Sequence, residues 1–382
     1  MNWVELSGLP TISIYDLDIQ KREDALVAAS FGRGFYVIDN YAPLRELNEA
    51  NLKKEAHLFE IKESLQFIPS DPYGLRGTGF QGTNLWMAKN PKIGANIFLH
   101  IRDNYKSLKN KRQSKEKKLE KEGSDVSYPS FSDLRKEKLD KKAMIILVIS
   151  DASGNEIRRL TKNASKGIMK FNWNYRGAST SPINTKDVYD GFLVPPGVYY
   201  ATSYIYSNGD VRLLSEKKAF KVKTLNNQTI KYDADELISF RKQLSSINID
   251  FTTIKNQMKN FKTKVNHIEN ALIKYPNTDT KYLQQINKLN AAYDSCNLIV
   301  WGDNLKSKHQ FETSPSLQNR FGMLQYKLSG NMSGVTKTHK RDYAIIKEEC
   351  SNLSFKLKLM ITDLNSIHSS LKSLKDFPYI NE

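Results

Sequence analysis

The feature that most constrains the fold is a run of apolar residues, spaced alternately by three and four, between residues 237 and 272. Its members are Leu237, Phe240, Leu244, Ile247, Phe251, Ile254, Met258, Phe261, Val265, Ile268 and Leu272, and Pro276 follows them. This spacing places one apolar seam along a helix of about five heptads. Such a seam is stable only when it is covered, so this segment must pack against other helices.

A second seam near the C-terminal end makes a helical bundle the expected structure of residues 233–382. Its members are Tyr343, Ile346, Cys350, Leu353, Leu357, Met360, Leu364, Ile367, Leu371 and Leu374. Two shorter helical stretches, 282–298 and 317–328, lie between the seams. We expect the two long helices to run antiparallel within one chain, with left-handed, shallow-angle packing. Pairing of the seams between two copies of the chain is the alternative.

Residues 73–225 carry the sequence pattern of an antiparallel β-sandwich. Short β-prone runs such as AMIILVI, which begins at residue 143, alternate with turn sequences, and Asn208-Gly209 is the strongest hairpin signal. About six or more strands at this spacing predict an immunoglobulin-like or FlgD-like sandwich. Residues 46–72, of mixed charge, read as a connector that precedes it. The whole chain is therefore predicted to be a multidomain protein of β and α parts.

A strongly charged insertion at about residues 104–142 interrupts the sandwich. Its segment 106–122 holds eight basic and three acidic residues, and only Leu108 and Leu119 are apolar. This composition indicates a solvated helix or a mobile loop. The net charge of +17 raises the question of a nucleic-acid partner. We do not expect one, because segment 106–122 lacks interleaved aromatic residues. A cytosolic protein that holds nucleic acid with this segment is the alternative.

The first 45 residues predict a small antiparallel meander. Its strands fall within 11–19, 25–30 and 34–39, and Trp3 and Leu6 suggest a further strand. So few strands have little stability alone, and an open edge exposes unpaired backbone groups. We expect the partner strands of this sheet to be encoded elsewhere. A small cap packed on the next domain is the alternative.

No catalytic, metal or cofactor site is predicted from the residue pattern. The FGRG turn lacks the third glycine of a dinucleotide fingerprint, and DASGNE lacks the ligands of an EF-hand. Asp16, Asp18 and Asp39 lie on the meander, without the cleft that paired carboxylates of a glycosidase need. The histidines are isolated in sequence: His57, His100, His267, His309, His339 and His368. Four aromatic residues could stack on sugars, but core positions are expected for them: Trp86, Trp173, Tyr199 and Tyr200.

The two cysteines and the search for targeting signals do not identify the cellular compartment of the protein. Cys296 and Cys350 can form one bridge in an oxidising compartment or stay reduced. Their helical positions predict that they face each other across the bundle. The longest apolar run is far shorter than the ~20 residues of a membrane span. The N-terminal sequence MNWVELSGLP has no pattern of a signal peptide.

The order of these segments resembles the C-terminal part of secreted sortilin/VPS10-like β-propeller proteins of the BNR-repeat type, which are often labelled glycosyl hydrolases. The runs Ser30-Phe31-Gly32-Arg33 and Val37-Ile38-Asp39 stand where that family finishes its last propeller blade. The segments KGIMKFNWNYR and VPPGVYYATSYIYSNGD resemble its accessory sandwich, and SPSLQNRFGMLQYKLSG its helical tail.

The resemblance implies that residues 1–45 are the remnant of the last propeller blade, followed by an accessory sandwich and a helical bundle. It implies a secreted, periplasmic or cell-surface protein whose partner is a missing upstream propeller segment. The chain would then be a non-catalytic accessory region that binds a protein or glycan or docks the propeller. The alternative is the C-terminal portion of a glycoside hydrolase whose catalytic residues lie in that upstream propeller, which leaves the enzymatic status of the whole protein open.

Overall fold

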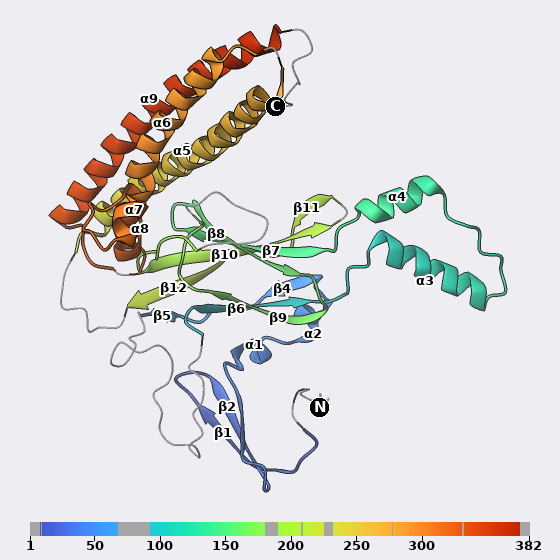
Figure 1. Cartoon of the computed structure of the whole chain (residues 1–382). Helices are drawn as coiled ribbons and strands as arrows, with labels where there is room; N and C mark the ends of the chain where they lie inside the picture. Colours follow the sequence, from blue (N-terminus) through green and yellow to red (C-terminus); the bar gives the residue numbers. More distant parts are fainter. Residues whose placement is uncertain are drawn as a thin grey trace. The chain divides into compact units, whose positions relative to one another are not determined.

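The computed structural model describes residues 8, 10–67, 92–179, 190–207, 209–224, 232–276, 278–330 and 332–374, which form two compact units. The first unit holds the described residues up to 67, from 92 to 175 and from 196 to 224. The second unit holds those between 176 and 195 and from 232 onward. Sheets build the first unit and a helical bundle builds the second (Figure 1), so the expected combination of β and α parts is confirmed.

The meander at the start of the first unit is a three-stranded antiparallel sheet in the order β1-β2-β3. Its strands are β1 (Ile14–Gln20), β2 (Ala25–Ser30) and β3 (Phe35–Ile38). The turn between β2 and β3 closes when Ser30 donates from its backbone N–H and its hydroxyl to the Gly34 carbonyl, at 3.0 and 2.7 Å. Gly34 has φ +78°, a conformation that favours glycine. Trp3 and Leu6, where a further strand was expected, lie outside the described residues.

The predicted β-sandwich is present as two sheets. One sheet has the order β5-β12-β10-β7-β8 with β11 paired to β10, and the other has the order β4-β6-β9. Each strand pair is antiparallel except β5 with β12, which is parallel. The strands are β4 (Ala56–Leu58), β5 (Ser64–Gln66), β6 (Ala95–Ile101), β7 (Met144–Asp151), β8 (Glu156–Asn163), β9 (Gly167–Trp173), β10 (Gly197–Ser207), β11 (Asp210–Leu213) and β12 (Lys218–Thr224).

The segment 46–72 is more than the connector that its mixed charge suggests. After the short helices α1 (Ala42–Arg45) and α2 (Glu49–Lys53), it supplies β4 to one sheet and β5 to the other. Both strands have only three residues, too few to show a clear alternation in sequence. Their burial comes from pairing with longer strands, which a local pattern does not reveal.

Trp173 of β9 joins the two sheets in the sandwich core. Its ring lies edge-on to those of Tyr199 on β10 and Phe220 on β12, with centroid distances of 4.9 and 5.8 Å. Phe171 points the same way as Trp173, because alternate residues of a strand share one face. Trp173 and Tyr199 are therefore core residues, as predicted. Tyr200 is half-buried on the other side of β10, with Lys217 Nζ 3.8 Å from its ring centroid, so the core position expected for it is wrong. Trp86 lies outside the described residues.

The charged insertion forms two helices, α3 (Leu108–Lys121) and α4 (Phe131–Leu139), between β6 and β7. Figure 1 shows them as a helical hairpin beside the sandwich, in the same unit. Each residue of both helices is exposed or half-buried. The expectation of a solvated helix is thus confirmed. We call α3, α4 and the loop between them the arm.

The second unit contains α5 (Ala234–Lys274), α6 (Lys281–Trp301), α7 (Asn304–Lys308), α8 (Leu317–Ser329) and α9 (Lys337–Lys372). All of the predicted seam residues of α5 are buried. The seam of α9 is buried from Ile346 to Leu371, with Tyr343 and Leu374 half-buried at its ends. Both heptad patterns therefore identify the bundle core correctly.

The two long helices run parallel, contrary to the antiparallel arrangement expected from the sequence. Near their N-terminal ends, Lys340 Nζ of α9 lies 2.6 Å from Glu236 Oε1 of α5, and the rings of Tyr343 and Phe240 lie 5.4 Å apart. α6 runs antiparallel to them and returns the chain only to the middle of α5, where the Trp301 ring lies 5.8 Å from Lys255 Nζ. α8 completes the return, because its Leu328 carbonyl accepts from Arg241 near the start of α5, and α9 then begins at that end (Figure 1).

Cys296 and Cys350 are free, buried thiols in the described structure. Cys350 of α9 lies near Asp250 of α5, and burial raises the pKa of its thiol to about 11. Cys296 of α6 instead lines a groove with Met360, further along α9. The expected pairing of the two cysteines across the bundle is therefore not formed.

Candidate interaction surfaces

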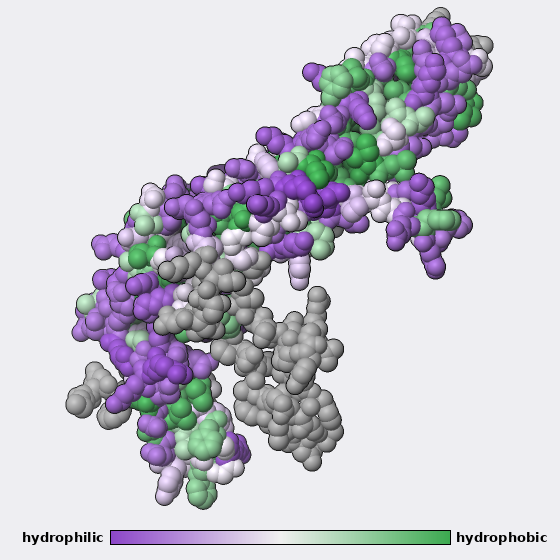
Figure 2. All heavy atoms as spheres, turned by 90° about the vertical axis from the view of Figure 1, so that its left-hand side faces the viewer, coloured by the Kyte–Doolittle hydropathy of each residue, from purple (hydrophilic) through white to green (hydrophobic). Residues whose placement is uncertain are grey.

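The meander exposes apolar side chains on both of its faces. On one face Leu17, which is 59% exposed, and Ile19 lie beside Ala28 and Leu26 of the next strand. The strand register puts Phe35, which is 76% exposed, on the opposite face with Val37 and Val27. Figure 2 shows hydrophobic side chains gathered on the meander, at the lower end of the view. Asp16 and Asp18 of β1 lie on this second face as well, so its apolar side chains are those of β2 and β3. Exposed apolar patches of this kind often mark interaction surfaces.

The contacts that hold the meander to the rest of its unit are mainly polar. Lys62 Nζ donates to the Arg22 carbonyl at 2.6 Å, and Arg45 pairs with Asp24 at 2.9 Å. Of the three strands, Ala28 is the buried position and β1 is exposed along its whole length. A cap packed on the next domain, the alternative expected for this segment, would bury one face of the sheet, whereas β1 is exposed along its whole length.

The carboxylates considered for catalysis, Asp16, Asp18 and Asp39, do not gather around a cleft. Asp16 and Asp18 lie on β1 and accept the backbone N–H groups of the residues that follow them, at 2.8 and 2.7 Å. Asp39 follows β3, on the other side of β2. The arrangement is that of an exposed strand and not of an acid–base pair.

The strand register brings together two histidines that are 43 positions apart in sequence. His57 of β4 pairs with His100 of β6. His57 Nε2 lies 3.1 Å from Glu46 Oε2, whereas the buried His100 Nδ1 has no hydrogen-bond partner within the described structure. Burial, His57 and Lys166 lower the pKa of His100. Sequence reasoning missed this pair because β4 lies in the segment taken for a connector.

Glu55 links three separate segments of the first unit. It accepts hydrogen bonds from the Tyr105 hydroxyl and from Arg212 of β11, each at 2.7 Å. The Arg212 guanidinium lowers the pKa of Glu55 to about 2, and burial raises the pKa of Tyr105 to about 12. Both groups therefore keep fixed protonation states at neutral pH. Their contacts fasten β11 to the start of β4 and do not provide an acid or base near neutrality.

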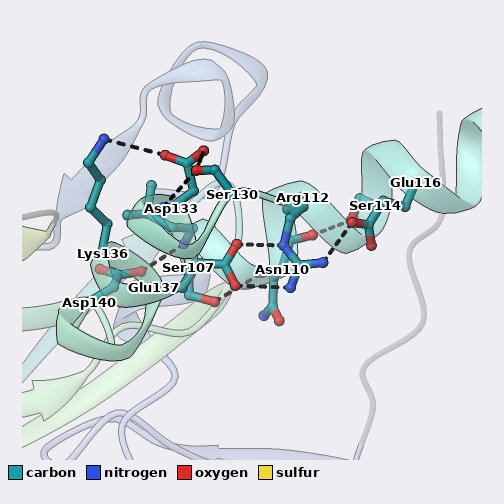
Figure 3. Close-up of polar contacts among 11 residues, drawn as sticks. Ser107, Asn110, Arg112, Ser114, Glu116, Ser130, Asp133, Lys136, Glu137 and Asp140 are labelled. Carbon is teal, nitrogen blue, oxygen red and sulfur yellow. Dashed lines mark hydrogen bonds and ion pairs between the residues drawn. The ribbon is translucent and has the colours of Figure 1, made fainter. Parts of the chain in front are cut away.

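Ion pairs and caps hold the arm together in place of a hydrophobic core (Figure 3). Arg112 of α3 bonds both carboxylate oxygens of Glu137 on α4, at 2.6 and 3.0 Å, and also bonds Glu116 at 2.6 Å. Ser107 caps α3, and Asp140 accepts the Leu108 N–H at 2.7 Å. Bidentate Arg–carboxylate pairs fix geometry as well as distance. The arm is thus an ordered element held together mainly by polar contacts.

Among the described residues, no group of three or more His, Cys, Asp or Glu side chains lies close enough together to hold a metal ion. In that same part of the chain, no helix combines the length and the hydropathy needed to cross a bilayer.

The DASGNE segment forms a turn after β7. The Asp151 carboxylate accepts the backbone N–H and the side-chain amide of Asn155, at 2.9 and 3.0 Å.

Comparison with known proteins does not assign a family. No protein-family model matches the chain, and no curated protein matches its sequence. Among solved structures, the extracellular domain of a hybrid two-component system from B. thetaiotaomicron aligns with 57% of this chain and 27% of its own length. The aligned residues are 10% identical and the TM-score is 0.16, which is too low to define a shared fold.

Proposed function

We propose that the chain is a non-catalytic accessory region of a secreted β-propeller protein of the sortilin/VPS10-like, BNR-repeat type. In this proposal the meander docks against an upstream propeller segment, and the sandwich and bundle serve as interaction domains for a protein or glycan. The motif order described above suggests the family. The observation that carries the proposal is the exposure of apolar side chains on both faces of the meander.

A propeller blade lies between two neighbouring blades, so both of its faces become buried when the propeller closes. The meander has the side chains for such a position, with Leu17 and Ile19 on one face and Phe35 and Val37 on the other. Burying one large apolar side chain stabilises by roughly 1.5–3 kcal/mol. β1 and β3 are also the two edges of the described sheet, where further strands can pair.

The test is to co-express the chain with a β-propeller encoded beside it in its own genome and to measure the affinity of the complex. The double substitution Leu17→Thr with Phe35→Thr keeps strand propensity but removes apolar area from both faces. We expect it to weaken the complex by at least ~10-fold. The matched control is Val211→Thr with Leu213→Thr on β11, two exposed apolar strand residues, which should leave the affinity unchanged.

Equal affinity of the meander variant and the unchanged chain would contradict docking through the meander. Glycoside cleavage by the complex but not by the chain alone would favour the hydrolase alternative. Cleavage by the chain alone that is lost with Asp16→Asn or Asp39→Asn would show that the accessory role is wrong.

A further inference from the structure

The outward face of α4 combines exposed apolar and basic side chains in one stripe. Phe131, Arg135 and Leu139 are spaced by four residues, so they lie above one another on the helix, with Lys138 beside them. Phe131 is 73% exposed and Leu139 is 80% exposed. Tyr128, 80% exposed, precedes the helix, and its ring lies edge-on to Phe131 with a centroid distance of 6.4 Å.

Three acidic side chains of the arm are paired within it, while Glu120, Glu122 and Asp125 are exposed. Arg112 neutralises Glu116 and Glu137 between the helices, and Asp133 is bound by Ser130 and Lys136. Figure 3 shows the bonds between Arg112 and Glu137 where α3 and α4 face each other. The remaining basic side chains of α3 are exposed: Lys109, Lys111, Lys115, Lys117, Lys118 and Lys121. On the exposed surface of the arm, basic side chains therefore outnumber acidic ones.

This chemistry fits an anionic lipid surface better than a nucleic acid. Lys and Arg side chains attract either partner, since both present phosphate groups. The stripe, however, includes the aliphatic Leu139, and Val126 in the loop is exposed as well. Aliphatic side chains gain free energy in the acyl region of a bilayer and find no equivalent on a phosphate backbone. Tyrosine also favours the boundary between water and lipid.

We propose that the arm binds the surface of anionic lipid bilayers. Tyr128, Phe131 and Leu139 enter the headgroup region, and Arg135 and Lys138 contact the anionic headgroups. The proposal is independent of the proposed function, because it uses residues of the arm alone. It also explains why side chains as apolar as Phe131 and Leu139 stay exposed on an ordered helix.

The test measures sedimentation of the full chain with vesicles of phosphatidylcholine alone or with one third phosphatidylglycerol. We expect binding to the anionic vesicles only, and release at high salt. Arg135→Gln with Lys138→Gln should weaken binding by roughly 30-fold, since each basic group near the surface contributes about 1 kcal/mol. Tyr128→Ser with Phe131→Ser should weaken it by at least ~10-fold.

Two matched variants control for charge and for hydrophobicity. Lys264→Gln with Lys358→Gln removes two exposed basic groups from the bundle, and Tyr326→Ser with Phe355→Ser removes an exposed tyrosine and phenylalanine. Both should bind as the unchanged chain does. Circular dichroism on each variant checks that the fold is retained.

Three results would overturn the proposal. The first is equal binding of the unchanged chain to neutral and anionic vesicles. The second is binding of the arm variants to anionic vesicles as tightly as the control variants bind. The third is no binding of the unchanged chain to either kind of vesicle. If the chain instead bound a short RNA or DNA duplex and lost that binding with the arm variants, the arm would be a nucleic-acid site.

Discussion

Arg241 shows how one polar side chain completes the core of the second unit. It is buried on α5 and donates to the Leu328 carbonyl at the end of α8, at 2.7 and 3.1 Å. It also donates to the Leu193 carbonyl at 2.5 Å. Burial lowers the pKa of Arg241 to about 10, so the side chain stays charged at neutral pH. It thereby supplies donors to carbonyls that a helix end leaves without partners.

Replacing Arg241 with methionine should lower the free energy of unfolding by about 2–4 kcal/mol, because buried carbonyls lose their donors. Lys242→Met, at the adjacent exposed position, removes the same charge and should change stability by less than about 0.5 kcal/mol. Urea denaturation of both variants measures the difference. Equal midpoints for the two would show that the Arg241 contacts contribute no net stability.

His100 makes the first unit sensitive to acid. Burial is the main cause of its lowered pKa, so the folded protein disfavours the charged imidazole. As the pH falls below about 6.5, the unfolded chain takes up a proton at this position before the folded chain does. Stability therefore decreases with falling pH in that range, since the unfolded state then binds more protons.

The substitution His100→Gln should reduce the loss of thermal stability between about pH 7.5 and pH 5.5, because glutamine does not titrate. His267→Gln, at an exposed position of α5, removes a histidine from the second unit and serves as the control. Differential scanning fluorimetry across the pH series gives the comparison. If His100→Gln shows the same pH dependence of thermal stability as the unchanged chain, His100 does not cause that dependence.

At the scale of elements, the arm and the sandwich strands are stabilised in different ways. The inward residues of β7 are buried, whereas each residue of α3 and α4 is exposed or half-buried. The arm therefore relies on capping and on the Arg112–Glu137 pair. Elements with few buried contacts open locally at lower free energy than the core does.

We expect the backbone amides of α3 and α4 to exchange hydrogen faster than those of β7. Glu137→Gln weakens the pair with Arg112 and should speed exchange in both helices on the order of tenfold, without lowering the global unfolding midpoint. Glu156→Gln, which weakens an exposed pair with Arg159 on β8, should have little effect. If amide hydrogen exchange in α3 and α4 is the same in Glu137→Gln as in the unchanged chain, the ion pair does not stabilise the arm, and its helix caps alone keep it ordered.

At the scale of the whole molecule, the direction of its longest helices follows from the order in which the chain fills the bundle. At 1.5 Å per residue, α5 and α9 are about 60 and 54 Å long, while α6 has 21 residues. α6 returns the chain along about half of α5, and α8 continues to Arg241, so that the second long helix starts where the first one starts. The two long helices therefore run parallel.

The double variant Glu236→Cys with Lys340→Cys should form a disulfide readily. Glu236 Oε1 and Lys340 Nζ lie 2.6 Å apart, so these two positions face each other. Glu236→Cys with Ser370→Cys should not form a disulfide, because position 370 lies about 45 Å further along α9. An antiparallel bundle would reverse this result. Mass spectrometry after brief oxidation distinguishes the two, with the native thiols protected by burial.

The local pattern determined which residues are buried. The heptad seams of α5 and α9, the strands β2, β7 and β10 and the core position of Trp173 follow from periodicity, because a helix or strand places residues of one period on one face. The exposed state of α3 also follows, since segment 106–122 has only two apolar residues, Leu108 and Leu119. These features depend on neighbours a few positions away.

Tertiary structure alone decided how those elements meet. The parallel direction of α5 and α9, the recruitment of β4 and β5 into the sandwich and the pairing of His57 with His100 depend on chain connection and strand register. The packing of α4 against α3 also decides that the stripe of Phe131, Arg135 and Leu139 is exposed. Periodicity defines a face but not its partner, because the free energy that selects the partner comes from contacts between residues far apart in sequence.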